Sequence, residues 1–172
     1  DVTAWSKDNL TICGVGGRAS LYADGKSSQG KAIWVIGGAN TVIDSIAFHN
    51  TKVADANGAG IRMEHKTGDL RVINSGFYDN ENGILTTGGP ITLTVERSEF
   101  ARNTDNKAAG QAHNIYAGAI DKLTVTASYF HEARYGSNVK SRAKESILEN
   151  NYIMDGTTGE GSYLTDFSNG GK

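Results

Sequence analysis

The sequence predicts an all-β protein, a parallel β-helix (solenoid) of about six or seven coils. Three observations favour this fold: apolar residues that recur in register, short segments that alternate apolar and polar residues, and many glycines in a chain with almost no proline. The 172 residues include 22 Gly, 1 Pro and 1 Cys, and 38% of them are hydrophobic. This length suits one domain, so residues 1–172 are expected to form a single β-helix domain or a segment of a longer helix.

The recurrence is seen in three columns of residues that keep step along the chain. The first column is Phe48, Phe77, Phe100, Phe130 and Ile153, at steps of 29, 23, 30 and 23 residues. The second column keeps the same steps and consists of Ile43, Val72, Val95, Val125 and Leu148. The third column consists of Ile61, Ile84, Ile115, Val139 and Tyr163. Periods of this size indicate a solenoid, in which each coil buries its apolar face against its neighbours.

Within each repeat the pattern predicts strands. Residues 91–95 and 123–126 alternate apolar and polar residues of high β propensity. Asn80 and Asn103 each follow a column Phe by three residues, which predicts an inward ladder of amides bonded to turn backbone groups. Insertions near residues 55–58 and 104–107 are expected to border a binding surface, as insertions in solenoids commonly do.

Composition and charge argue against several classes of protein. The net charge is −2, from 17 basic and 19 acidic residues without a basic tract, so no nucleic-acid partner is expected. No apolar run approaches the roughly 20 residues of a membrane-spanning helix, so no membrane partner is expected. The single Cys13 forbids an internal disulfide. The first residues lack the regions of a signal peptide, which predicts a mature segment or a fragment.

The third column places ionisable residues on one outer face, because the residue after an inward one points outward. The two outward columns are then Arg62, Leu85, Tyr116, Lys140, Leu164 and Glu64, Thr87, Gly118, Arg142, Asp166. Adjacent rungs lie about 4.8 Å apart. Tyr116, Lys140, Arg142 and Asp166 should therefore share one patch, and His113 enters the same strand from its leading turn.

This patch combines the groups needed to abstract a proton beside a carboxylate. Uronic-acid polymers are cleaved or epimerised in this way, with cations for the carboxylate, a base near C5 and an acid for the leaving oxygen or the opposite face. Lys140 and Arg142 would hold the carboxylate, and Asp166 would orient Arg142. Tyr116 and His113 would transfer protons, with Lys140 as a second candidate base.

Further polar residues near the patch are expected to bind substrate. These are Asn114, Asn138, Asp166, Arg62 and Glu64. Outward charges on a β-surface are also ordinary, and cross-strand ion pairs are common. The concentration of ionisable residues on one strand series favours the functional interpretation.

Two other groups of polar residues are assigned to the solvated surface. His49 and His131 directly follow a column Phe and are expected to face solvent on another side. Asp79 and Glu132 share a column that could hold Ca²⁺, but Arg102 interrupts it. No metal site and no cofactor are therefore predicted.

Several segments carry a resemblance to a known family. They are residues 113–116, 123–125 with 129–131, 140–143, and 162–166 with 169–171. Together they resemble bacterial right-handed parallel β-helix repeat proteins of the pectate-lyase-like superfamily. The resemblance implies a groove along one sheet and a secreted or periplasmic polysaccharide lyase, uronate epimerase or glycoside hydrolase. The chain lacks the Arg-x-Pro-x-x-Arg motif of pectate lyases and the Asp-Pro-His-Asp signature of alginate epimerases, so no named substrate is implied.

These features predict a lyase or C5-epimerase acting on an acidic, uronate-containing polysaccharide. The alternative is a non-catalytic carbohydrate-binding or structural solenoid, such as part of a surface or fibre protein, whose uncapped coils could associate end to end. A glycoside hydrolase is disfavoured because it needs two carboxylates about 5 to 9.5 Å apart. Glu64 and Asp166 are expected four rungs apart, roughly 19 Å.

Overall fold

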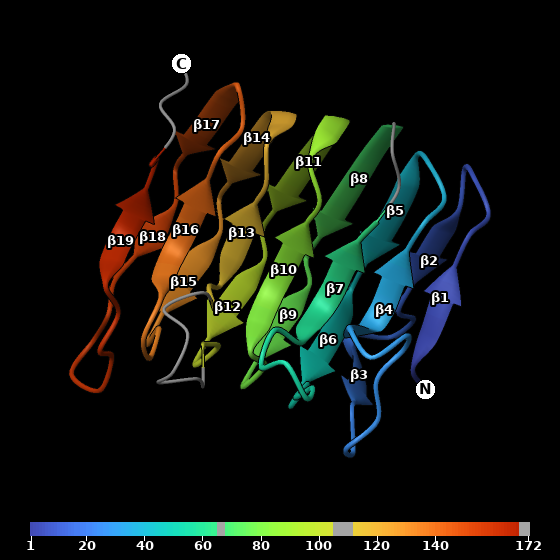
Figure 1. Ribbon diagram of the computed structural model, residues 1–172, viewed down its shortest axis with the longest axis horizontal. Helices are drawn as coiled ribbons and strands as arrows, with labels where there is room; N and C mark the ends of the chain where they lie inside the picture. The colour runs from blue at the N-terminus through green and yellow to red at the C-terminus, as the bar shows by residue number, and fades with distance from the viewer. Residues whose placement is uncertain (65–67, 105–111, 169–172) are drawn as a thin grey trace.

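The computed structural model describes residues 1–64, 68–104 and 112–168, which form a solenoid of three parallel sheets (Figure 1). Within these residues the sheets contain seven, six and six strands that pair in parallel, and one isolated antiparallel bridge joins Ser28 and Ala32 outside the strands. The chain adds one strand to each sheet in turn, and its first and last strands lie at opposite ends of the solenoid (Figure 1). The prediction of an all-β parallel β-helix is therefore confirmed.

Every third strand along the chain belongs to the same sheet. The first sheet contains β1 (Thr3–Trp5), β4 (Ala32–Ile36), β7 (Ala59–Met63), β10 (Asn82–Thr86), β13 (Ile115–Ala117), β16 (Ser137–Ser141) and β19 (Tyr163–Asp166). The second sheet contains β2 (Thr11–Cys13), β5 (Thr41–Asp44), β8 (Gly68–Ile73), β11 (Gly89–Glu96), β14 (Ile120–Thr126) and β17 (Glu145–Glu149). The third sheet contains β3 (Ala19–Tyr22), β6 (Ile46–His49), β9 (Gly76–Tyr78), β12 (Glu99–Ala101), β15 (Tyr129–His131) and β18 (Tyr152–Ile153).

The core is built from the first two predicted columns. Phe48, Phe77, Phe100 and Phe130 are fully buried and stack with ring centroids 4.6 to 5.1 Å apart. The aliphatic column from Ile43 to Leu148 pairs residue for residue through the second sheet. Because parallel pairing in register places like residues on like, each coil buries its apolar face on the next.

The predicted inward ladder of amides at Asn80 and Asn103 is confirmed, and it extends further along the solenoid than predicted. The Nδ2 group of Asn80 donates to Asn103, that of Asn103 to Asn114, and that of Asn114 to Asn138, at 3.0, 2.7 and 2.7 Å. Asn138 then donates to a carboxylate oxygen of Asp155 at 3.0 Å. The ladder satisfies polar groups that would otherwise be buried without partners.

In five coils the chain bends at a single left-handed residue between the second and third sheets, and the next strand begins one or two residues later. This residue has a φ between 45° and 57°: Ser45, Asn74, Arg97, Ala127 and Asn150. The left-handed conformation turns the chain sharply enough for the next strand to begin this soon. The residue that follows this turn in three of the coils is a serine, and each serine Oγ accepts a hydrogen bond from a backbone N–H of the preceding coil.

The third predicted column is correct for four coils and wrong in the last. Ile61, Ile84, Ile115 and Val139 pair as expected, but Val139 pairs with Thr165, and Tyr163 lies opposite Ser137. The turn before β19 is two residues longer than the sequence pattern indicated. The register of β19 could not be predicted from an inward apolar column, because the side chains of this last strand are largely exposed.

The insertion expected near residues 55–58 forms a loop beside the first sheet. The Oε2 atom of Glu81 accepts hydrogen bonds from the backbone N–H groups of Gly58 and Val53, at 2.6 and 3.1 Å. Burial raises the pKa of Glu81, against the lowering effect of these two donors. Most of the insertion near residues 104–107, and the segment 169–171, lie outside the described residues.

Candidate functional site

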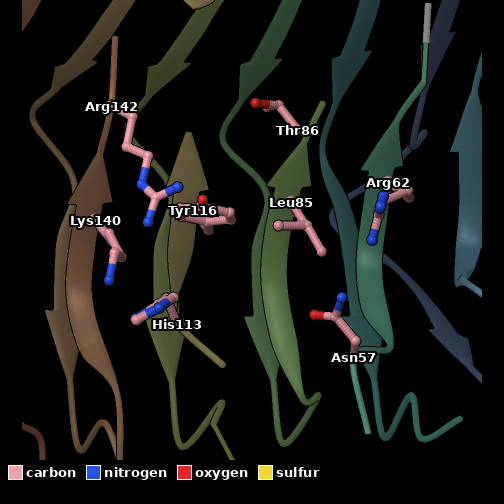
Figure 2. Close-up of a pocket in the computed structure, with 8 residues that line it drawn as sticks. All are labelled: Asn57, Arg62, Leu85, Thr86, His113, Tyr116, Lys140 and Arg142. Carbon is pink, nitrogen blue, oxygen red and sulfur yellow. The ribbon is translucent and has the colours of Figure 1, made fainter. Parts of the chain in front are cut away.

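A pocket of about 300 Å³ lies on the outer face of the first sheet, across β7, β10, β13 and β16 (Figure 2). Its lining residues are Asn57, Arg62, Leu85, Thr86, His113, Tyr116, Lys140 and Arg142. All four residues predicted to be catalytic are in this set, together with Arg62. The pocket runs along the solenoid axis, because it draws residues from four successive coils.

The backbone register explains how these residues meet. Arg62, Leu85, Tyr116 and Lys140 occupy equivalent outward positions on neighbouring strands. Arg142 follows two residues after Lys140, and its guanidinium carbon lies 5.7 Å from the centroid of the Tyr116 ring. This distance is that of a cation–π contact, so Arg142 is held above the ring of Tyr116.

Asp166 is near the pocket, but its predicted role was wrong. The two-residue shift in β19 places Asp166 opposite Lys140, and its carboxylate lies 3.1 Å from the Lys140 Nζ atom. Asp166 therefore orients Lys140 and not Arg142. A protonated ammonium group that donates to a carboxylate offers no lone pair, which favours Lys140 as a cation and not as a base.

His113 lies beneath the pocket in a neutral form. Only 3% of the residue is exposed, and its Nδ1 atom accepts a hydrogen bond from the Ser137 backbone N–H at 2.9 Å. Burial lowers the pKa of His113 from 6.5 to about 4, and the charges of Lys140 and Arg142 act in the same direction. Since Nδ1 is occupied as an acceptor, the proton of the neutral ring is on Nε2. His113 can donate a hydrogen bond, but it has no charged form for proton transfer at neutral pH.

Asn114 and Asn138 do not face the pocket, which corrects their prediction as substrate-binding residues. Both are fully buried, and their amides belong to the inward ladder. Asn114 directly precedes β13, which carries Tyr116, and Asn138 lies within β16, which carries Lys140. Their contribution is to fix those strands in register.

A second charged cluster lies at the β7 end of the pocket. Arg62 Nε donates to Glu64 Oε1 at 2.7 Å, and Lys31 Nζ lies 3.2 Å from the same oxygen. Glu64 therefore binds Arg62 from outside the pocket lining. Lys31 and Asn57 were not predicted, because turn residues carry no periodic signal. The insertion near residues 55–58 was the only indication of Asn57.

Comparison with known proteins establishes the family. The family described as the right-handed beta helix region matches residues 8–169. The chain belongs to the right-handed β-helix family. No curated protein and no solved structure matches the chain. The family thus accounts for the fold and its hand, and the function has to be argued from the pocket.

Histidines on the third sheet of this right-handed β-helix are more covered than predicted. The His49 ring stacks between Tyr22 and Tyr78, with centroids 4.5 and 5.1 Å apart. Burial lowers the pKa of His49. His131 stacks on Tyr129 at 4.2 Å. Both histidines lie on the outer face of a different sheet from the pocket, but neighbouring side chains shield them from solvent.

The column considered for Ca²⁺ is occupied by ion pairs. Arg102 lies 3.1 Å from a carboxylate oxygen of Asp79 and 3.5 Å from one of Glu132. Across residues 1–64, 68–104 and 112–168, no group of three or more His, Cys, Asp or Glu could hold a metal ion. The same residues contain no helix long and apolar enough to cross a membrane.

The charge state of His113 predicts that acid destabilises this β-helix. Its pKa of about 4 lies below the unfolded value of 6.5, so the unfolded state binds more protons between these two pH values. Stability is fully present above pH 6.5 and falls as the pH is lowered toward 4. We expect a loss of about 2 kcal/mol between pH 7 and pH 4.5, measured by urea denaturation.

The His113→Asn variant is the matched control for this loss. Its side-chain oxygen can still accept from the Ser137 N–H, but it does not titrate. Most of the difference between pH 7 and pH 4.5 should disappear, leaving a smaller contribution from His49. An unchanged difference would show that His113 is not the group responsible.

Proposed function

We propose that this right-handed β-helix binds an acidic, uronate-containing polysaccharide in the pocket and acts on it as a pectate-lyase-like lyase. The observation that carries the proposal is the position of Tyr116, which shares a solvent-facing pocket with Lys140 and Arg142. This places an ionisable hydroxyl group among cations, which is what proton abstraction beside a carboxylate requires.

The residues support a stepwise elimination. Lys140 and Arg142 bind the uronate carboxylate and neutralise it, which makes the proton on C5 more acidic. Tyr116, as phenolate, takes that proton, and the electron pair of the C5–H bond passes to the carboxylate as an enolate. The Nε2–H group of His113 donates a hydrogen bond to the developing charge. The C4–O4 bond then breaks, a C4–C5 double bond forms, and the proton on Tyr116 passes to O4.

The arrangement favours elimination over epimerisation at C5. Epimerisation needs proton transfer on both faces of the sugar ring. Among the described residues, the lining groups that could exchange a proton with the sugar, Tyr116 and the ammonium of Lys140, lie on the neighbouring strands β13 and β16 of one sheet. A sugar on the sheet therefore meets them from one side. Glycoside hydrolysis is not supported, because no carboxylate lines the described pocket.

The test is ultraviolet absorbance during incubation with a panel of acidic polysaccharides, with and without a chelator. A rising signal reports unsaturated uronate ends and supports the lyase, and the chelator arm decides whether a metal takes part. A flat trace with exchange of the C5 proton for deuterium would indicate an epimerase. Saturable binding without either signal would leave a carbohydrate-binding module, and no binding to any polymer would overturn the proposal.

A further inference from the structure

Building on the proposed function, we infer that the pocket selects an alternating polysaccharide, in which an uncharged sugar separates successive acidic sugars. The feature that supports this is the order of side chains along the pocket. Cations lie at both ends, at Arg62 and at Lys140 with Arg142, and an apolar side chain, Leu85, lies between them (Figure 2).

The direction of the pocket sets how a polymer would lie in it. The lining residues come from four successive strands of the first sheet, and parallel rungs are about 4.8 Å apart. A sugar ring advances an extended polysaccharide by about the same distance. A chain lying along the solenoid axis therefore places about one sugar over each rung.

Each end of the pocket carries one net positive charge. At the β7 end, two cations, Lys31 and Arg62, surround one carboxylate, Glu64. At the other end, Lys140 pairs with the carboxylate of Asp166, and the second cation, Arg142, lies beside them. Each end matches one monoanionic group, so the ligand should carry a charge at both ends.

The middle rung is apolar. Leu85 is 3% exposed and packs in a small apolar cluster with Val35, Ala59 and the ring of Tyr116. The next lining residue, Thr86, is buried and its Oγ1 accepts from the Gly118 N–H at 2.9 Å. A carboxylate placed over Leu85 would meet only neutral donors among the described lining residues, the Asn57 amide and the Thr86 hydroxyl, and no cation to offset its loss of water. The sugar over β10 should therefore be uncharged.

These features assign one sugar to each of three rungs. The reacting uronate lies over Tyr116 on β13, where Lys140 and Arg142 bind its carboxylate. An uncharged sugar lies over Leu85 on β10, and a second acidic sugar lies over Arg62 on β7. An alternating uronate–N-acetylhexosamine polymer has this pattern, whereas a homopolymer of uronates places a third charge over Leu85.

The experiment compares binding of two hexasaccharides by calorimetry, one alternating uronate–N-acetylhexosamine and one homouronate. The Tyr116→Phe variant is used throughout, so that neither ligand is consumed. We expect the alternating ligand to bind about tenfold more tightly. Adding Arg62→Gln should weaken its binding about tenfold, because one charged hydrogen-bonding partner is lost.

The matched control is Arg71→Gln. Arg71 pairs with Glu96 on the outer face of the second sheet, away from the pocket, and should leave both affinities unchanged. Equal or tighter binding of the homouronate, or no effect of Arg62→Gln, would overturn the inference of alternation and leave the lyase proposal standing. If neither ligand binds, both the inference of alternation and the lyase proposal are overturned.

Discussion

The Tyr116→Phe variant is expected to lose turnover of acidic polysaccharide by about a thousandfold while it still binds the polymer. General acid–base catalysis contributes about 10² to 10⁴ in rate, and in the proposed mechanism Tyr116 both takes and returns the proton. Phenylalanine keeps the ring that lies beneath Arg142 and against Leu85. The shape of the pocket and the cations that bind the carboxylate should therefore be preserved.

The measurement is kcat/KM by ultraviolet absorbance, with the affinity for the polymer determined separately. Lys140→Ala should abolish turnover as well, but it should also weaken binding, because it removes a carboxylate-binding cation and leaves Asp166 without its ion pair. Tyr22→Phe, on the exposed face of the third sheet, is the control and should have no effect. Turnover that survives in Tyr116→Phe would remove Tyr116 as the base.

The Asn103→Ala variant is expected to lower the free energy of unfolding by about 4 kcal/mol or more. Asn103 accepts from the backbone N–H and the side-chain amide of Asn80, both at 3.0 Å. It donates to the Phe77 carbonyl at 2.9 Å and to Asn114 at 2.7 Å. All these groups are buried, and each one left without a partner costs about 1 to 3 kcal/mol.

Urea denaturation followed by tryptophan fluorescence would measure this loss. Thr124→Ala on the outer face of the second sheet is the control, and its effect should stay below about 1 kcal/mol. The free energy of unfolding of a domain is only about 5 to 15 kcal/mol. The expected loss in Asn103→Ala is therefore a large part of the total stability. A loss below about 1 kcal/mol would mean that water replaces the missing amide.

The architecture was predictable because a solenoid repeats the same packing problem in each coil. The Phe and aliphatic columns had to keep step, since parallel pairing stacks each residue on its equivalent. The position of Tyr116, Lys140 and Arg142 on one face followed from the same register. These three residues meet in the structure as the alternation of inward and outward positions indicated.

What was missed depends on turn length and on burial. The turn before β19 is longer than predicted, so Asp166 lies opposite Lys140 and not beside Arg142. The length of a turn leaves no periodic signal in the sequence. Asn114 looked like a candidate for binding, but the ladder that begins at Asn80 and Asn103 extends through it. The neutral state of His113 depends on its contact with the Ser137 N–H and on its burial, and neither can be deduced from spacing.

The amide ladder has a consequence for how the chain acquires its structure. Asn80 and Asn114 each donate to an amide one coil further along the chain, and Asn103 donates to Asn114 at the start of the coil that follows. In a quasi-one-dimensional protein, structure can nucleate at one place and then propagate between neighbours. Each folded coil therefore presents the amide groups that the next coil needs, so the structure can extend coil by coil along the solenoid axis. A defect in a central coil would interrupt this extension, because the coils on either side of it are coupled only through their neighbours.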